Sequence, residues 1–128
     1  MRIIRMTIRY IGKTLNLESG EINLIILAVD EACSNIIKHA YKGPTDKPIH
    51  ITCNLYHDHI EFTLKDRGEK ANLADIKSRK LDDVRPGGLG VHLIKSVMDE
   101  VRYDTETDNC NRLTMIKFLK QRNLNDKN

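Results

Sequence analysis

The stretch "IHITCNLYHDHIEFTLKD", residues 49–66, decides the fold of this chain. Apolar and polar residues alternate along both of its halves, and a short polar turn at residues 57–59 separates the halves. Such alternation is typical of half-buried strands, so residues 49–56 and 60–66 are predicted to form an antiparallel hairpin. The residues expected on its buried face are Ile49, Ile51, Cys53, Leu55, Ile60, Phe62 and Leu64.

The first segment of the chain, residues 2–15, carries two overlapping patterns. Ile4, Met6 and Ile8 alternate with polar residues as in a strand, whereas Ile4, Ile8 and Ile11 follow helical spacing. The helical pattern continues over the longer stretch, so we predict a helix here.

A second helix is predicted from about Glu21 to Tyr41, because the apolar run "INLIILAV" leads into it and a Gly-Pro pair follows it. Ser19 or Gly20 is expected to cap its amino end. This helix and the first one precede the hairpin in the chain, so helices and strands come in separate runs.

The second half of the chain repeats the alternation of helix and hairpin. After a polar segment with a possible short helix at 72–80, a helix is predicted at about 90–100, and two strands follow at 101–107 and 112–120. The order predicts an α+β fold, a two-layer α/β sandwich with a mostly antiparallel sheet covered by helices on one face. We expect residues 1–128 to form a single domain.

The composition excludes several classes of protein. The net charge is +3, and the lysines and arginines are spread among 18 acidic residues, which argues against nucleic-acid binding. No apolar run is long enough to cross a membrane, and no signal peptide is recognisable. The three cysteines form no CxxC pair, which argues against a disulfide framework or zinc cage and favours a reducing cytoplasm.

Polar residues are unexpected in the second helix. Its carboxyl half reads "DEACSNIIKHAY", residues 30–41, where Glu31, Asn35 and Lys38 share one face at helical spacing. One interpretation is a solvated stripe; the other is the floor of a site with a proton-accepting acid, an amide for a hard cation and a lysine for phosphate. The helix alone leaves both open.

Two further stretches carry possible chemistry. In "RPGGLGVHLIKSVMDEV", residues 85–101, glycines precede a helix whose free N–H groups and dipole suit a phosphate. In "TLKDRGEKANL", residues 63–73, Asp66 and Gly68 end a strand, where an acid can accept a hydrogen bond from an amino group. Taken singly, each is weak evidence, and for Asp66 and Gly68 alone an ordinary strand-ending turn is the favoured interpretation.

Together and in this order, E-x-x-x-N, D-x-G and G-x-G resemble the N, G1 and G2 boxes of the GHKL ATPases. The segments "AVDEACSNIIKHAY", "DRG" and "GGLGVHLIKSVMDEV" are most similar to those of the anti-sigma-factor serine kinases, over roughly residues 3–119. The resemblance implies the Bergerat ATP-binding fold, with ATP and Mg²⁺ as ligands.

The resemblance also implies roles for individual residues on the second helix. Glu31 would be the general base for a serine or threonine hydroxyl, and Asn35 would hold Mg²⁺ against the triphosphate. Lys38 would touch a phosphate, and His39 would lie near the nucleotide.

Elsewhere, the resemblance implies that Asp66 accepts a hydrogen bond from the adenine amino group and that Gly68 flanks the ring. Thr114 would support the adenine through Asp66 or a water molecule, and Arg5 would contact a protein partner. The segment implied to line the phosphates comprises Gly87, Gly88, Leu89, Gly90 and Val91.

The implied function is an ATP-dependent serine/threonine kinase that regulates an anti-sigma system in the cytoplasm. Its substrate would be a STAS-type anti-anti-sigma protein and its second partner a sigma factor, and a homodimer is common among the relatives it resembles. The alternative is a binding module that holds a nucleotide and exchanges partners without phosphorylating them.

The chain departs from the family pattern at three points. Lys70 replaces the last glycine of D-x-G-x-G, the lid at residues 69–86 is short, and the chain starts with a helix where the family usually has a strand. The sheet edge is therefore expected to be either exposed or paired with a partner. The first two departures favour the alternative without phosphorylation.

Overall fold

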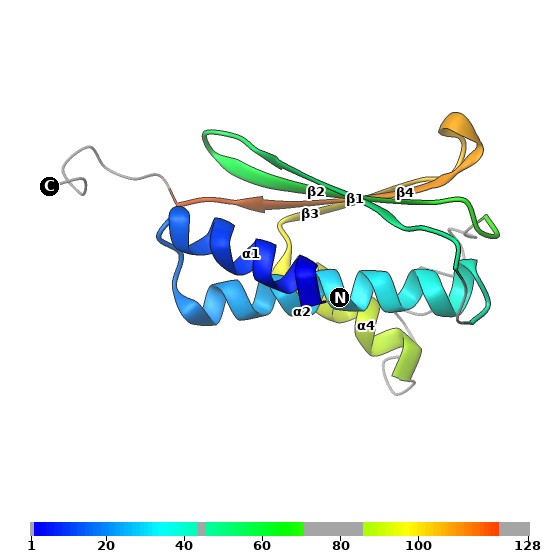
Figure 1. Ribbon diagram of the computed structural model, residues 1–128, viewed down its shortest axis with the longest axis horizontal. Coiled ribbons are helices and arrows are strands. Elements are labelled where there is room, and N and C mark those ends of the chain that lie inside the picture. Colours follow the sequence, from blue (N-terminus) through cyan, green and yellow to red (C-terminus); the bar gives the residue numbers. More distant parts are fainter. Residues whose placement is uncertain (1, 44–45, 71–85, 121–128) are drawn as a thin grey trace, which may run out of the picture.

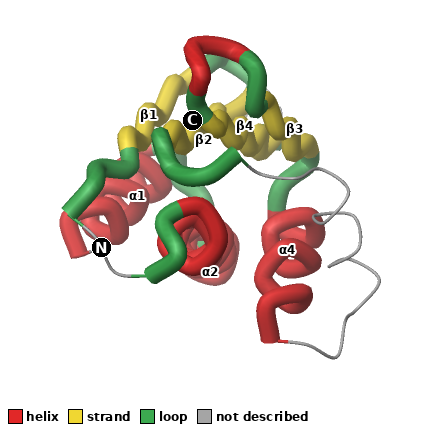
Figure 2. The backbone as a smooth tube through the Cα atoms, turned by 90° about the vertical axis from the view of Figure 1, so that its right-hand side faces the viewer, coloured by secondary structure: helices red, strands yellow, loops and turns green. Residues whose placement is uncertain are grey.

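The computed structural model describes residues 2–43, 46–70 and 86–120, with the backbone only for 86–91. The elements form two layers, a sheet and a layer of helices that covers one of its faces (Figures 1 and 2). This arrangement confirms the predicted α+β sandwich. Within the described residues, no helix has the length and apolar character that a bilayer crossing requires.

In the described part of the chain, the sheet has four antiparallel strands in the order β1-β2-β4-β3. The strands are β1 His50–Leu55, β2 His59–Asp66, β3 Glu100–Asp104 and β4 Asn111–Phe118. The predicted hairpin is β1 and β2, in which Cys53 lies opposite Phe62. The predicted second pair is β3 and β4, joined by a 3₁₀ turn at Thr107–Asn109.

Helix α1, Arg2–Thr14, confirms the helical interpretation of the first segment. Its inner side buries Ile8 and Gly12. A Cβ atom on Gly12 would lie 2.5 Å from Ile22 Cγ1, so the missing side chain allows α1 to approach α2 closely.

Helix α2, Ser19–Asn35, lies in the middle of the helical layer between α1 and α4 (Figure 2). Its amino-terminal cap is Glu18, whose side chain makes no capping hydrogen bond, so the cap predicted at Ser19 or Gly20 is wrong. Those two residues instead belong to the first turn of α2. The buried residues of α2 pack against the sheet.

The predicted single helix up to Tyr41 is divided in two. After Asn35 the chain widens into the π-helix η1, Ile36–Ala40, in which Tyr41 N donates to Ile36 O at 3.0 Å. Single π turns of this kind are rare in proteins, and those that occur often lie at functional sites.

Helix α4, Pro86–Val97, packs against α2 and contributes Ile94 and Val97 to the core. It begins earlier than the predicted start near residue 90, because Pro86 occupies its first position, where a fixed φ and a missing N–H carry no cost. The short helix predicted at 72–80 lies outside the described residues.

Candidate functional site

Strand β2 ends at Asp66, which continues the buried face of that strand and is only 3% exposed. Its Oδ1 accepts hydrogen bonds from Gly68 N and from Asn111 Nδ2, both at 2.9 Å. Among the described residues, none donates to Oδ2. The carboxylate is thus held firmly through one oxygen, which leaves the other available to a ligand.

Asn111 belongs to the candidate site, although the sequence did not indicate it. It lies opposite Asp66 in the β2–β4 register and is 8% exposed. Its Nδ2 also donates to Glu69 O at 2.9 Å, so one amide holds both the carboxylate and the turn that follows it. The sequence gives no sign that Asn111 contacts Asp66, because the two residues are 45 positions apart and meet only through the register of β2 and β4.

Gly68 is needed for a close backbone contact. A Cβ atom at this position would lie 2.6 Å from Ala40 O, and Glu69 N donates to the same oxygen at 2.8 Å. The turn after β2 is thereby fixed to the end of η1. The close approach of Ala40 O explains why position 68 needs a glycine. That Gly68 also flanks the adenine ring stays a prediction.

Glu31 and Asn35 lie one turn apart near the end of α2, and both are half-buried. The Nδ2 atom of Asn35 is buried and has no hydrogen-bond partner within the described residues. A buried N–H donor without a partner is costly, so this nitrogen suits an acceptor such as a phosphate oxygen or a water molecule. The carbonyl oxygen of the same carboxamide is the atom that suits a hard cation. In the part of the chain described, no hydrogen bond restrains Glu31, which leaves its carboxylate free to meet a hydroxyl group.

Lys38 and His39 lie in η1 and are both exposed. The predicted alignment of Lys38 with Glu31 and Asn35 assumed α-helical spacing, and the wider π turn changes that alignment. The structure therefore groups Glu31 with Asn35 and places Lys38 and His39 on the next, wider turn.

The glycine-rich segment lies inside α4 rather than in a loop before it. Its residues, Gly87, Gly88, Leu89, Gly90 and Val91, form the first turns of the helix. The first N–H groups of a helix have no intrahelical partners, so this end still offers donors for an anion. The start of α4, the end of β2 and η1 all lie toward the same end of the molecule (Figure 1).

Thr114 does not come together with Asp66. It pairs with Thr63 in the register, and its neighbours Leu113 and Met115 point into the core. Successive side chains of a strand point to opposite faces, so Thr114 lies on the face away from the helices while Asp66 faces them. The support predicted for Thr114 therefore does not fit the structure, and Asn111 occupies the position next to Asp66.

Arg5 has a partner within the chain. Its Nε and Nη2 both lie 2.8 Å from Asp30 Oδ2, which joins α1 to α2. This pair explains the acid at position 30, whereas contact of Arg5 with a protein partner stays a prediction. Burial, and secondarily the charge of Asp30, raises the pKa of the nearby Cys33 thiol to about 11.

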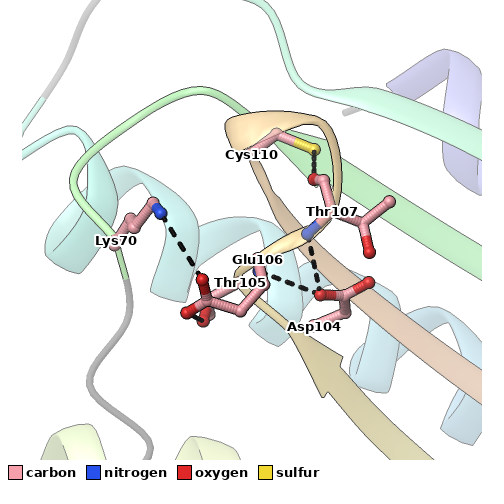
Figure 3. A network of polar contacts seen from close by, with 6 residues as sticks. All are labelled: Lys70, Asp104, Thr105, Glu106, Thr107 and Cys110. Carbon is pink, nitrogen blue, oxygen red and sulfur yellow. Dashed lines mark hydrogen bonds and ion pairs between the residues drawn. The ribbon is translucent and has the colours of Figure 1, made fainter.

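Lys70, which replaces a family glycine, lies 4.0 Å from Glu106 in the turn between β3 and β4 (Figure 3). Both side chains are at least half exposed, so the pair contributes little stability. The turn itself is ordered by Asp104, which accepts from Glu106 N at 2.9 Å and Thr107 N at 3.1 Å. A side-chain hydrogen bond with Thr107, together with those two N–H groups, lowers the Asp104 pKa to about 2.

Comparisons with known proteins agree with this geometry. Residues 1–117 match the model of the histidine kinase-like ATPase domain. A serine-protein kinase RsbW of Bacillus licheniformis is 29% identical over 132 residues, covering 97% of this chain and 81% of the relative. The RsbW of Bacillus subtilis is 31% identical over 125 residues, covering 91% and 77%.

A solved structure shares the fold. The mycobacterial sensor histidine kinase MprB superposes with a TM-score of 0.58 at 16% identity, over 79% of this chain and 72% of that one. At this identity the likeness supports the fold alone.

Proposed function

Because the chain belongs to the histidine kinase-like ATPase domain family, we propose that it binds Mg·ATP and transfers the γ-phosphoryl group to a serine or threonine of a protein partner. Relatives at about 30% identity over most of the chain are named serine-protein kinases, which supports the choice of acceptor.

The arrangement of Asp66 is the observation that carries the proposal. A buried carboxylate with one oxygen held by two donors can receive an amino group on the other. The adenine amino group is such a donor, and Gly68 would leave room beside the ring. Asn111 would keep the carboxylate in position for that contact.

The end of α2 would hold the reacting groups. Asn35 would ligate magnesium through its carbonyl oxygen, and its buried Nδ2, which has no acceptor among the described residues, would donate to a phosphate oxygen or a water molecule. Magnesium bound there would offset the negative charge of the triphosphate. Glu31 would accept or orient the proton of the attacking hydroxyl.

The phosphates would be held by the chain around them. Lys38 would provide a positive charge, and His39 would lie near the nucleotide. The backbone N–H groups of Gly87 and Gly88 would donate from the start of α4, and Gly90 would line the phosphates. Phosphoryl transfer depends mainly on positioning and on charge stabilisation, which these groups would supply.

The resemblance to anti-sigma-factor kinases supports a regulatory role for this activity. The phosphate acceptor would be a STAS-type anti-anti-sigma protein, and a sigma factor would be the second partner. We place this exchange in the cytoplasm, with the chain acting as a homodimer.

Transfer of ³²P from γ-labelled ATP to a purified STAS-type protein from the same organism tests the proposal. We expect the wild-type chain to label the partner, and Glu31→Gln to bind Mg·ATP with unchanged affinity but label it at least about 100-fold more slowly. ATP binding without any labelling by wild type would contradict the kinase and support the nucleotide-bound partner switch. Absence of ATP binding by the folded chain would exclude both.

A further inference from the structure

Tyr41 follows η1 directly, and its side chain joins segments that are distant in the sequence. Its hydroxyl donates to Pro48 O at 2.6 Å, in the segment that leads into β1. The same oxygen accepts a hydrogen bond from Arg67 N at 3.3 Å, in the turn after β2. Lys47 Nζ lies over the ring, 5.9 Å from its centroid. The half-buried phenol is therefore a fixed junction between η1, the start of the sheet and the end of β2.

The three backbone amides that follow Asp66 all have partners. The second one, from Gly68, donates to the Asp66 carboxylate itself. The first and the third, from Arg67 and Glu69, donate to consecutive residues at the end of η1, namely the hydroxyl of residue 41 and the carbonyl of residue 40. The two outer amides thus hold the backbone on either side of the bond that holds the carboxylate.

The bond from Arg67 N restrains Asp66 in a way that Asn111 does not. A peptide group is planar, so fixing its N–H fixes the plane that joins Asp66 to the turn. Asn111 acts on the carboxylate oxygen from β4, whereas Tyr41 acts on the main chain from η1. The orientation of the carboxylate depends on both, because a side chain can be aimed only from a backbone that is itself held.

The π-helix determines where Tyr41 points. Tyr41 N closes the last π turn by donating to Ile36 O at 3.0 Å. A π turn contains one residue more than an α turn, so the side chain that follows it lies on a different side of the helix. The widened turn therefore lies between Asn35, which we assign to magnesium, and the junction that Tyr41 makes with the turn after β2.

We propose that Tyr41 is a positioning residue for adenine recognition, whose hydroxyl sets the orientation of the Asp66 carboxylate through the Arg67 amide. This inference rests on the proposed function, in which that carboxylate accepts a hydrogen bond from the adenine amino group. Tyr41 would act through the backbone and not on the nucleotide. Its hydroxyl should therefore matter only for the part of the binding that depends on the amino group.

Two nucleotides that differ in the amino group test the proposal by calorimetry. Purine riboside triphosphate lacks the exocyclic amino group of ATP, so wild type should prefer Mg·ATP by at least about tenfold. Tyr41→Phe keeps the ring and loses both hydroxyl hydrogen bonds. It should reduce this preference by roughly fivefold, while its affinity for the analogue changes by less than about twofold.

Tyr56→Phe is the matched control. It removes a hydroxyl from a tyrosine in the turn between β1 and β2, at the opposite end of β2 from Asp66. Lys42→Ala is a second control, because it removes only an exposed ion pair with Glu69 in the same turn. Both controls should keep the preference of wild type for ATP.

Amide hydrogen exchange followed by NMR tests the restraint in the chain without nucleotide. In Tyr41→Phe the Arg67 amide should exchange at least about tenfold faster than in wild type, because it loses its acceptor. The Glu69 amide keeps Ala40 O as its acceptor, so its exchange should change by less than about threefold. Equal exchange of the Arg67 amide in the two chains would overturn the proposal.

The binding results separate this inference from the proposed function. If wild type binds neither nucleotide, or binds both equally, the assignment of Asp66 to adenine fails and the inference fails with it. If wild type prefers ATP and Tyr41→Phe keeps the full preference, the inference alone fails. A loss of affinity for both nucleotides by the same factor would assign the Tyr41 hydroxyl to the fold and would also overturn the inference.

Discussion

Asn111 Nδ2 lies 2.9 Å from Asp66 Oδ1, across the strand pair that joins β4 to β2. The same nitrogen lies 2.9 Å from Glu69 O. One buried amide thus fixes both the carboxylate that we assign to adenine and the turn that follows it. The consequences of removing this amide can be measured separately for stability and for nucleotide binding.

Replacing Asn111 by leucine should lower the free energy of unfolding by about 1–3 kcal/mol, because Asp66 Oδ1 and Glu69 O each lose the hydrogen bond from its buried amide. The affinity for Mg·ATP should fall by roughly tenfold, since Asp66 would no longer be held in one orientation. Urea unfolding and calorimetry measure the two effects.

The conservative change Asn111→Thr distinguishes positioning from general damage. A threonine hydroxyl can donate one hydrogen bond, so this variant should recover part of the nucleotide affinity. Equal nucleotide affinity in Asn111→Leu and wild type would show that the amide serves only the fold.

Gly68→Ala should lower the free energy of unfolding by about 1–3 kcal/mol, because the new Cβ would lie 2.6 Å from Ala40 O and the backbone must shift. Gly20→Ala is the matched control, since a Cβ there meets nothing within 4 Å and the position is helical. The control should be neutral or stabilising by up to about 1 kcal/mol. Equal thermal midpoints for the two variants would contradict the close contact.

Arg5→Ala should destabilise the chain by about 1–2 kcal/mol, because Asp30 keeps an 18% exposed carboxylate without its partner. In a double-mutant cycle with Asp30→Asn, the combined change should be smaller than the sum of the single changes. Strict additivity of the free energies of unfolding would show that the ion pair contributes nothing.

Cys33 should make stability depend on pH in the alkaline range. Its folded pKa is raised to about 11 from an ordinary value of 9.0, so the unfolded thiol ionises first as the pH rises. The stabilisation is therefore complete below pH 9.0 and is lost toward pH 11, at up to about 1.4 kcal/mol per pH unit. Urea unfolding should show that the free energy of unfolding of wild type falls relative to that of Cys33→Ala as the pH rises from 9.0 to about 11. A constant difference between the two free energies over this range would contradict the raised pKa of Cys33.

Local patterns were sufficient to predict most of the fold. The alternation in residues 49–66 predicted β1 and β2, and helical spacing correctly favoured α1 over a strand. Two features of the helices that these patterns missed are the π turn after Asn35 and the early start of α4. They depend on packing and on one proline rather than on periodicity.

The candidate site was less predictable because several of its contacts join distant segments. The order of the three motifs indicated Asp66, Glu31 and Asn35, but only the β2–β4 register brings Asn111 to Asp66. The same register places Thr114 on the opposite face of the sheet, which a motif comparison cannot reveal.

Calorimetric titration of Mg·ATP into wild type and Asp66→Asn tests the central claim most directly, because the substitution removes the carboxylate charge with little change in shape. We predict saturable binding to wild type and a loss of affinity of at least about 100-fold in the variant, with both chains showing the same circular dichroism. Equal affinity in the two folded chains would contradict the assignment of Asp66 to adenine.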